Sequence, residues 1–143
     1  LGDVYKRQEQ LSEEPIEYII DEIMCEIAGF PEHISNAEIF LFGFSQGACT
    51  ASILIDRYPN MFKAGILVSN YPIPWHQYNK DQDVPVFSVH GRKDVITMRQ
   101  FSKLEKRYSQ NHHESWVHDK GHMIPKNGDA INRYLEFIQK HIS

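Results

Sequence analysis

The sequence predicts an α/β fold in which a sheet of four mostly parallel strands carries helices on both faces. Helical and strand-like patterns alternate along the chain, as they do where helices cross between parallel strands. The runs Ala64–Ser69 and Val84–His90 are almost continuously apolar, which is typical of strands buried on both faces. A third apolar run, Ile39–Phe42, leads through a glycine-rich turn directly into a helical pattern.

The segment Ser12–Gly29 is predicted to form an amphipathic helix. Ser12 can cap its first turn, and Gly29 and Pro31 end it. Because its apolar residues form one stripe, we expect this helix to pack on one surface, that of a sheet. The stripe consists of Ile16, Ile19, Ile20, Ile23, Met24 and Ile27.

Three further helices and a fourth strand follow from the same patterns. The helices are predicted over Gln46–Tyr58, Arg99–Ser109 and Asp129–His141, and the strand over Glu114–Val117. The last helix is expected to turn one apolar stripe toward the sheet. This stripe consists of Ile131, Tyr134, Leu135 and Ile138.

Length and composition are those of one ordinary globular domain. The net charge is -4 over 143 residues without a run of Lys or Arg, so no nucleic-acid partner is expected. No apolar run is long enough to cross a bilayer, so no membrane span is expected. Cys25 and Cys49 fit free, buried thiols in a reducing compartment, which favours a cytoplasmic protein. No pattern specifies an oligomeric state.

The first eight residues differ in character from the rest of the chain. Asp3 to Gln8 looks like the conceptual translation of a transposon-type sequencing adapter, so we interpret Leu1–Gln8 as a non-native scar. Residues 9–143 then form a single, incomplete domain that lacks its natural N-terminal part. The alternative is a natural, charged N-terminus.

The stretch Gly43–Gly47 reads Gly-Phe-Ser-Gln-Gly and joins a predicted strand to a predicted helix. There, the pattern G-x-S-x-G is typical of a nucleophile elbow, a strained turn that projects a serine hydroxyl above the sheet. We expect side chains at Gly43 and Gly47 to collide with the neighbouring strand and helix. The N–H of Gln46 should point to where an oxyanion forms. The alternative is a glycine-rich turn whose Ser45 merely caps the helix.

A serine nucleophile needs a base, and that base needs an orienting acid. Asp94 follows the strand Val84–His90 at its C-terminal end and is the predicted acid. The alternative for Asp94 is an exposed or helix-capping turn residue. His122 lies on the loop after the last strand, between a glycine and a proline-terminated stretch, and is the predicted base.

The other histidines are predicted to have structural or solvated positions. His112 and His113 precede the last strand and therefore lie at its wrong end, and His118 should be drawn into the sheet. His90 is expected to support the loop beneath Asp94. Because the segment has no H-E-x-x-H pattern and no nearby cysteine, we predict no metal site.

Three motifs resemble the small serine hydrolases of the α/β-hydrolase superfamily. They are G-F-S-Q-G-A at Gly43–Ala48, H-G-R-K-D-V-I at His90–Ile96 and G-H-M-I-P at Gly121–Pro125. Two groups are similar, namely the "family of serine hydrolases" group and the phospholipase/carboxylesterase group that includes acyl-protein thioesterases. The third motif and the short distance from Asp94 to His122 favour the first group.

The resemblance implies an esterase or thioesterase that acts on a small-molecule or acyl-protein substrate without a cofactor. It assigns the catalytic roles to Ser45, Asp94 and His122. These families begin with a strand and an H-G-type loop that supplies a second oxyanion N–H, and nothing before Ser45 resembles that loop. The chain therefore resembles the C-terminal portion of such an enzyme, and we expect it alone to be weakly active or inactive. An acyltransferase on the same elbow and a catalytically inactive interaction module are the alternatives.

The connection Asn70–Asp83 carries apolar side chains that could line an open acyl groove. These residues are Tyr71, Ile73, Trp75 and Tyr78. An equally favoured alternative is that they anchor the connection on the sheet.

Overall fold

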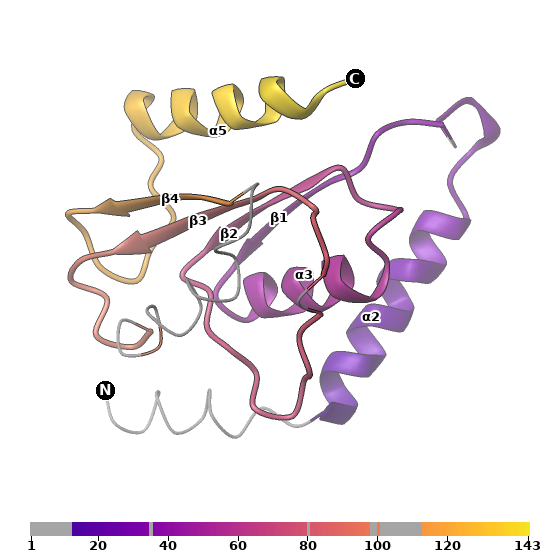
Figure 1. Ribbon diagram of the computed structural model, residues 1–143, viewed down its shortest axis with the longest axis horizontal. Helices are drawn as coiled ribbons and strands as arrows, with labels where there is room; N and C mark the ends of the chain where they lie inside the picture. The colour runs from indigo at the N-terminus through magenta and orange to yellow at the C-terminus, as the bar shows by residue number, and fades with distance from the viewer. Residues whose placement is uncertain (1–12, 35, 80, 98–99, 101–112) are drawn as a thin grey trace.

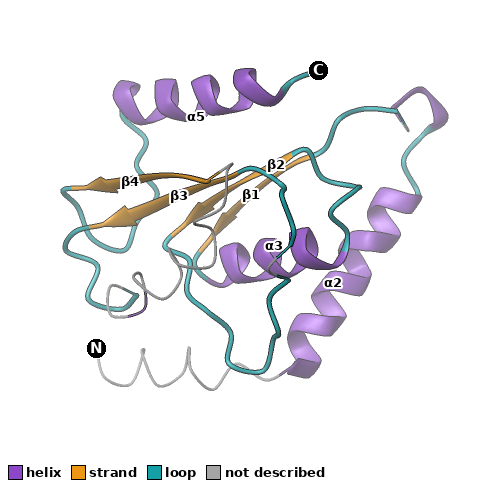
Figure 2. Cartoon of the chain, in the orientation of Figure 1, coloured by secondary structure: helices purple, strands orange, loops and turns teal. Residues whose placement is uncertain are grey.

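The computed structural model describes residues 13–34, 36–79, 81–97, 100 and 113–143. Its strands form one parallel sheet in the order β1-β2-β3-β4. The strands are β1 (Phe40–Phe44), β2 (Ala64–Val68), β3 (Val86–Gly91) and β4 (His113–His118). Helices lie on both faces of the sheet, which confirms the predicted α/β architecture (Figure 1; Figure 2).

The two central strands explain the continuous apolar runs of the sequence. Every residue of β2 and β3 is buried, because each strand has neighbours on both sides and helices cover the sheet. The parallel register pairs Phe42 with Ile66 and Ile66 with Phe87. The carboxyl ends of the strands therefore meet at one edge of the sheet, which is where open α/β sheets place their ligands.

Two helices cover one face of the sheet. Helix α3 (Gln46–Arg57) packs directly on β1 and β2, and nine of its residues are buried. Helix α2 (Glu13–Ala28) lies against α3, and a short 3-10 helix (Glu32–Ile34) follows it (Figure 1). The buried side chains of α2, Ile16 and Ile20, share a cluster with α3 and with the connection after β2. The expectation that α2 packs on the sheet is therefore wrong, because α3 already covers that face.

Helix α5 (Gly128–His141) covers the opposite face of the sheet (Figure 1). The side chain of Asn127 caps its first turn by accepting the N–H of Ala130 at 2.8 Å. Lys140 and His141 lie in its last turn, where positive charge favours the helix dipole. These end signals account for a helix that begins within one residue of its predicted start.

The stripe that α5 turns toward the sheet is only partly the predicted one. Tyr134 is buried as expected, but Ile131 and Leu135 are 44% and 49% exposed. Phe137 is buried instead, and its ring lies 5.5 Å from that of Phe87 on β3. The helix is thus rotated toward its aromatic side, because the two large rings fill the space above the sheet.

Strand β1 ends two residues later than the sequence pattern predicts. β1 extends to Phe44, so Gly43 belongs to the strand rather than to the turn. Apart from Gln100, the predicted helix Arg99–Ser109 lies outside the described residues, as does Leu1–Gln8. None of the described helices is both long and apolar enough to cross a membrane.

Candidate active site

Ser45 lies in the turn between β1 and α3, at the carboxyl edge of the sheet. Its backbone angles, φ 55° and ψ −116°, include a positive φ that non-glycine residues rarely adopt. Its N–H donates to the carbonyl oxygen of Val68 at 2.8 Å, which fastens the turn to β2. The Ser45 hydroxyl makes no capping hydrogen bond to α3, so the helix-cap alternative is wrong.

The two glycines of this turn differ in the space around them. A Cβ atom added to Gly43 would lie 2.5 Å from the carbonyl oxygen of Gly47 and 2.7 Å from Cα of Ala48. Glycine is therefore required at 43 by the close approach of β1 and α3. At Gly47 an added Cβ would meet no atom of the described residues within 4 Å. The predicted collision at Gly47 is wrong.

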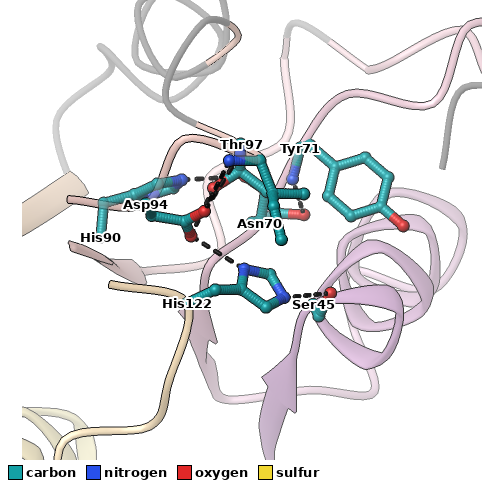
Figure 3. Close-up of polar contacts among 8 residues, drawn as sticks. Ser45, Asn70, Tyr71, His90, Asp94, Thr97 and His122 are labelled. Carbon is teal, nitrogen blue, oxygen red and sulfur yellow. Dashed lines mark hydrogen bonds and ion pairs between the residues drawn. The ribbon is translucent and has the colours of Figure 1, made fainter. Parts of the chain in front are cut away.

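His122 lies between Ser45 and Asp94 (Figure 3). Its Nε2 is 3.0 Å from Oγ of Ser45, and its Nδ1 is 2.9 Å from Oδ2 of Asp94. Because an ionised carboxylate only accepts hydrogen bonds, the arrangement assigns the ring proton to Nδ1. Nε2 is then the acceptor for the Ser45 hydroxyl. The structure thus brings together the three residues that the sequence singled out.

Asp94 is held in place by its own turn. Its side chain is fully buried, and its Oδ1 accepts the N–H groups of Ile96 and Thr97 at 3.0 and 3.2 Å. Its Oδ2 accepts the Thr97 hydroxyl at 2.7 Å. Burial raises the pKa of Asp94, but hydrogen bonds from His122 and Thr97 outweigh it and hold the pKa below its ordinary value. Asp94 therefore remains ionised beside His122.

Thr97 is a site residue that the sequence motifs did not indicate. It contributes both its hydroxyl and its backbone N–H to Asp94 (Figure 3). The available signal was the spacing of an aspartate three residues before a threonine, which is typical of a side chain that satisfies the N–H groups of its own turn. Asp94 thus caps its turn and also contacts His122, so the two interpretations of this residue are compatible.

His90 supports the neighbouring connection rather than the turn of Asp94. Its ring is fully buried, and Nε2 donates to the carbonyl oxygen of Asn70 at 2.9 Å (Figure 3). Burial lowers the pKa of His90 to about 4, although the Asn70 carbonyl opposes this shift. His90 is therefore a neutral hydrogen-bond donor that joins the end of β3 to the segment after β2.

The other described histidines of this region contact partners other than Ser45. His113 begins β4, and its Nε2 lies 2.9 Å from Oγ of Ser88 in the sheet. His118 ends β4 and is buried, as predicted. His112 lies outside the described residues. Within the described ranges, no group of three or more His, Cys, Asp or Glu side chains is arranged to hold a metal ion.

The connection after β2 does not offer the predicted groove. Tyr71 and Ile73 are 3% and 1% exposed and belong to the core between α2 and α3. Trp75 packs against the same core, and the Tyr78 hydroxyl accepts the N–H of Ile73 at 3.0 Å. The four residues therefore anchor the connection, and an open groove formed by Tyr71 and Ile73 is wrong.

An apolar cavity of about 370 Å³ lies instead between α2, α3 and β1. Gln46 and Gly47 form its end nearest to Ser45. Gln46 is the first residue of α3, so its N–H has no acceptor within the helix. The residues around the cavity are Ile19, Ile23, Leu41, Phe42, Gln46, Gly47, Thr50, Ala51 and Leu54.

Known proteins resemble the chain at the levels of family and fold. The sequence profile of the family described as "Serine hydrolase (FSH1)" matches residues 14–134. No curated protein sequence matches the chain. Among solved structures, the protein Atu2452 of unknown function from Agrobacterium tumefaciens has a TM-score of 0.71 and 20% identity, covering 89% of this chain and 63% of that one.

Two structures of esterases resemble the chain with comparable TM-scores. The esterase Pf2001 from Pyrococcus furiosus has a TM-score of 0.68 and 18% identity, covering 87% of this chain and 62% of its own. The carboxylesterase from Mesorhizobium loti has a TM-score of 0.69 and 16% identity, covering 90% of this chain and 64% of its own. This chain thus spans less than two thirds of each of these proteins, and likeness at such identities concerns the fold.

The family match decides between the two groups that the motifs resemble. It covers most of the chain and contains the turn of Ser45, as well as Asp94 and His122. The parallel sheet, with helices on both faces, is the fold that the solved structures share with it. The chain therefore belongs to the serine hydrolase (FSH1) family and has the α/β-hydrolase fold.

Proposed function

We propose that this protein hydrolyses carboxylic esters or thioesters through an acyl-serine intermediate. The observation that carries the proposal is the continuous hydrogen-bonded chain from Ser45 through His122 to the ionised Asp94. Family membership supports a serine hydrolase, and the names of two solved structures with this fold, an esterase and a carboxylesterase, agree with it.

Each of the three hydrogen-bonded residues has a role that follows from its position. Oγ of Ser45 attacks the carbonyl carbon while Nε2 of His122 takes the hydroxyl proton. The same nitrogen then delivers that proton to the leaving alcohol or thiol. Asp94 holds the proton on Nδ1 and stabilises the positive charge that develops on the ring. Water then attacks the acyl carbon while Nε2 takes a proton from it. The bond between the acyl carbon and Oγ breaks, the proton passes to Oγ of Ser45, and the carboxylic acid is released.

The negative charge of the tetrahedral intermediate needs donors close to Ser45. The N–H of Gln46 lies at the N-terminus of α3, where the helix dipole also favours negative charge. We assign this N–H as one oxyanion donor. The proposal requires no cofactor, since the three side chains and this N–H complete each proton transfer by themselves.

A cytoplasmic location also belongs to this proposal. Both cysteines are free thiols. Cys49 is buried as expected, whereas Cys25 is exposed, so the predicted burial of Cys25 is wrong. Thiols persist in reducing compartments. Fractionation of cells that produce the protein would test the location.

Active-site labelling tests the nucleophile directly. A fluorophosphonate probe should label the protein, and Ser45→Ala should abolish both labelling and turnover of a short p-nitrophenyl ester. Ser115→Ala, which alters an exposed serine on β4, is the matched control and should leave both unchanged. Labelling of the Ser45→Ala protein at the wild-type rate would refute the proposal.

The roles of the acid and the base predict graded losses of activity. His122→Gln should slow ester turnover by several orders of magnitude, because no base accepts the Ser45 proton. Asp94→Asn should slow turnover about 10⁴-fold, because it favours the wrong tautomer of the His122 ring.

Product analysis with an added alcohol measures acyl transfer to the alcohol against hydrolysis by water. If the alcohol ester dominates over the acid, the protein is an acyltransferase instead.

A further inference from the structure

The end of β3 and the loop that carries His122 approach each other unusually closely at Gly91. A Cβ atom added to Gly91 would lie 2.3 Å from the carbonyl oxygen of Gly121 and 2.4 Å from that of Lys120. Both obstacles are backbone atoms, which cannot rotate aside as a side chain can. Among the described glycines none has a positive φ, so Gly91 is required by space and not by its backbone conformation.

Backbone hydrogen bonds join the same two segments. The N–H of Arg92 donates to the carbonyl oxygen of His118 at 2.8 Å, and the N–H of Lys93 donates to that of Lys120 at 3.0 Å. Arg92 and Lys93 lie between Gly91 and Asp94, so these bonds tie the turn of the acid to the loop of the base. The relative position of the two loops is thus set by their backbones.

The His118 ring also lies against Gly91 and the loop that carries His122. Its ring is buried, Nδ1 accepts the N–H of Lys120 at 3.1 Å, and Cε1 lies 2.9 Å from the position of a Cβ on Gly91. Burial lowers the pKa of His118, although Asp94 and Asp119 oppose this effect. The ring is therefore neutral, and Nδ1 keeps the lone pair that accepts this N–H.

We propose that Gly91 and His118 are positioning residues. They fix the position of residues 118–122 and thereby hold the His122 ring between Ser45 and Asp94. This inference rests on the proposed function. His122 makes two hydrogen bonds of 2.9 and 3.0 Å at once, so a small displacement of its loop breaks one of them. A methyl group at 91 displaces the two carbonyls by about 1 Å, and a displacement of that size can cost about 100-fold in rate.

A pair of glycine variants separates this role from a general loss of stability. Gly91→Ala should lose the low-field proton NMR signal of the His122 Nδ1–H, which is assigned by its absence from His122→Gln. It should also react about 100-fold more slowly with the fluorophosphonate probe. Gly128→Ala is the matched control, since a Cβ there meets open space, and it should change neither measurement.

A second pair of variants tests the positioning role of His118 without adding a side chain at residue 91. In His118→Asn the amide oxygen takes the place of Nδ1 and can accept the Lys120 N–H, so signal and labelling should be retained. His118→Leu fills similar space without an acceptor and should lose both. This pair decides the question if Gly91→Ala does not fold.

The two measurements also distinguish the two proposals. A wild-type protein that shows the Nδ1–H signal but is not labelled would refute the proposed hydrolase function. The NMR signal of the variants would still test the positioning role of Gly91 and His118. If folded Gly91→Ala and His118→Leu both keep the signal at its wild-type position, the positioning role is wrong.

Discussion

At the scale of single residues, the two glycines beside Ser45 differ in whether the space around them would admit a side chain. A side chain at Gly43 meets backbone atoms of Gly47 and Ala48 at 2.5–2.7 Å, whereas one at Gly47 meets nothing in the described structure. Ser45 itself holds a positive φ, so the turn already stores strain. An opening of the turn would move the Ser45 hydroxyl away from His122.

This difference predicts opposite outcomes for two alanine variants. Gly43→Ala should lower the free energy of unfolding by about 1–3 kcal/mol and abolish fluorophosphonate labelling. Gly47→Ala should keep the labelling and change the stability by no more than about 1 kcal/mol, because alanine favours the first turn of α3. Urea denaturation and probe labelling measure both. Equal losses in the two variants would contradict this account.

A second prediction at this scale concerns His90 and pH. Burial lowers the pKa of His90 to about 4, whereas a histidine in an unfolded chain titrates near 6.5. The unfolded state therefore binds this proton more readily, and stability is lost as the pH falls from about 6.5 to about 4. The loss from this one residue should be on the order of 3 kcal/mol.

His90→Gln isolates that contribution. The glutamine amide nitrogen can replace Nε2 as the donor to Asn70 but does not titrate, so the variant should lose less stability between pH 7 and pH 4. His33→Gln, in the exposed 3-10 helix after α2, is the control and should keep the wild-type slope. Urea midpoints measured at several pH values compare the three proteins, and parallel slopes for all three would overturn the assignment.

At the scale of elements, α5 shows how a helix chooses between two apolar stripes. Its sequence offers Ile131 and Leu135 on one side, and Tyr134 and Phe137 on the next. The aromatic side faces the sheet, where Phe137 packs on Phe87 and the Tyr134 hydroxyl donates to the carbonyl oxygen of Pro125 at 2.9 Å. The larger buried area and the hydrogen bond favour this rotation.

Truncation of one residue from each stripe tests this orientation. Phe137→Ala should lower the free energy of unfolding by about 3–5 kcal/mol, because it leaves a cavity above β3. Leu135→Ala should cost about 0.5 kcal/mol or less, since its side chain is half exposed. Thermal or urea unfolding gives both values. A larger loss for Leu135→Ala would mean that the helix faces the sheet with its other stripe.

At the scale of the whole molecule, the sheet presents an apolar edge at β1. β1 pairs with β2, and among the described residues it has no strand on its other side. Phe42 in this strand is 50% exposed although its ring packs on Tyr134, and the apolar cavity lies beside it. The described part of β1 contains no Lys or Pro, which often protect such edges.

We therefore expect this 143-residue chain to self-associate as its concentration rises. Phe42→Lys should shift the protein toward the monomer, because a charge on an edge strand opposes pairing. Met61→Lys alters a comparably apolar residue, 37% exposed in the turn after α3, and should have no such effect. Size-exclusion chromatography with light scattering measures the mass. A wild-type chain that stays monomeric at every concentration would disprove this expectation.

The sequence by itself determined the features that depend on local pattern and on chain order. Apolar runs predicted β2 and β3 because strands buried on both faces consist mostly of apolar residues. The G-x-S-x-G pattern predicted the turn of Ser45 because an apolar strand pattern precedes it and a helical pattern follows it. Position after successive parallel strands selected Asp94 and His122, since parallel strands deliver the loops that follow them to the same edge of the sheet.

Only the tertiary structure decided how surfaces that are distant in sequence meet. The packing of α2 on α3, the buried Tyr71 and the open space at Gly47 all depend on neighbours that no local pattern names. The contact of Gly91 and His118 with residues 118–122 is of the same kind, because it arises where two backbones lie so close that a Cβ atom at 91 would be 2.3 Å from a carbonyl oxygen. Periodicity specifies which side chains share a face of a helix or strand. Which other element packs on that face depends on the arrangement of all elements that buries the most apolar surface.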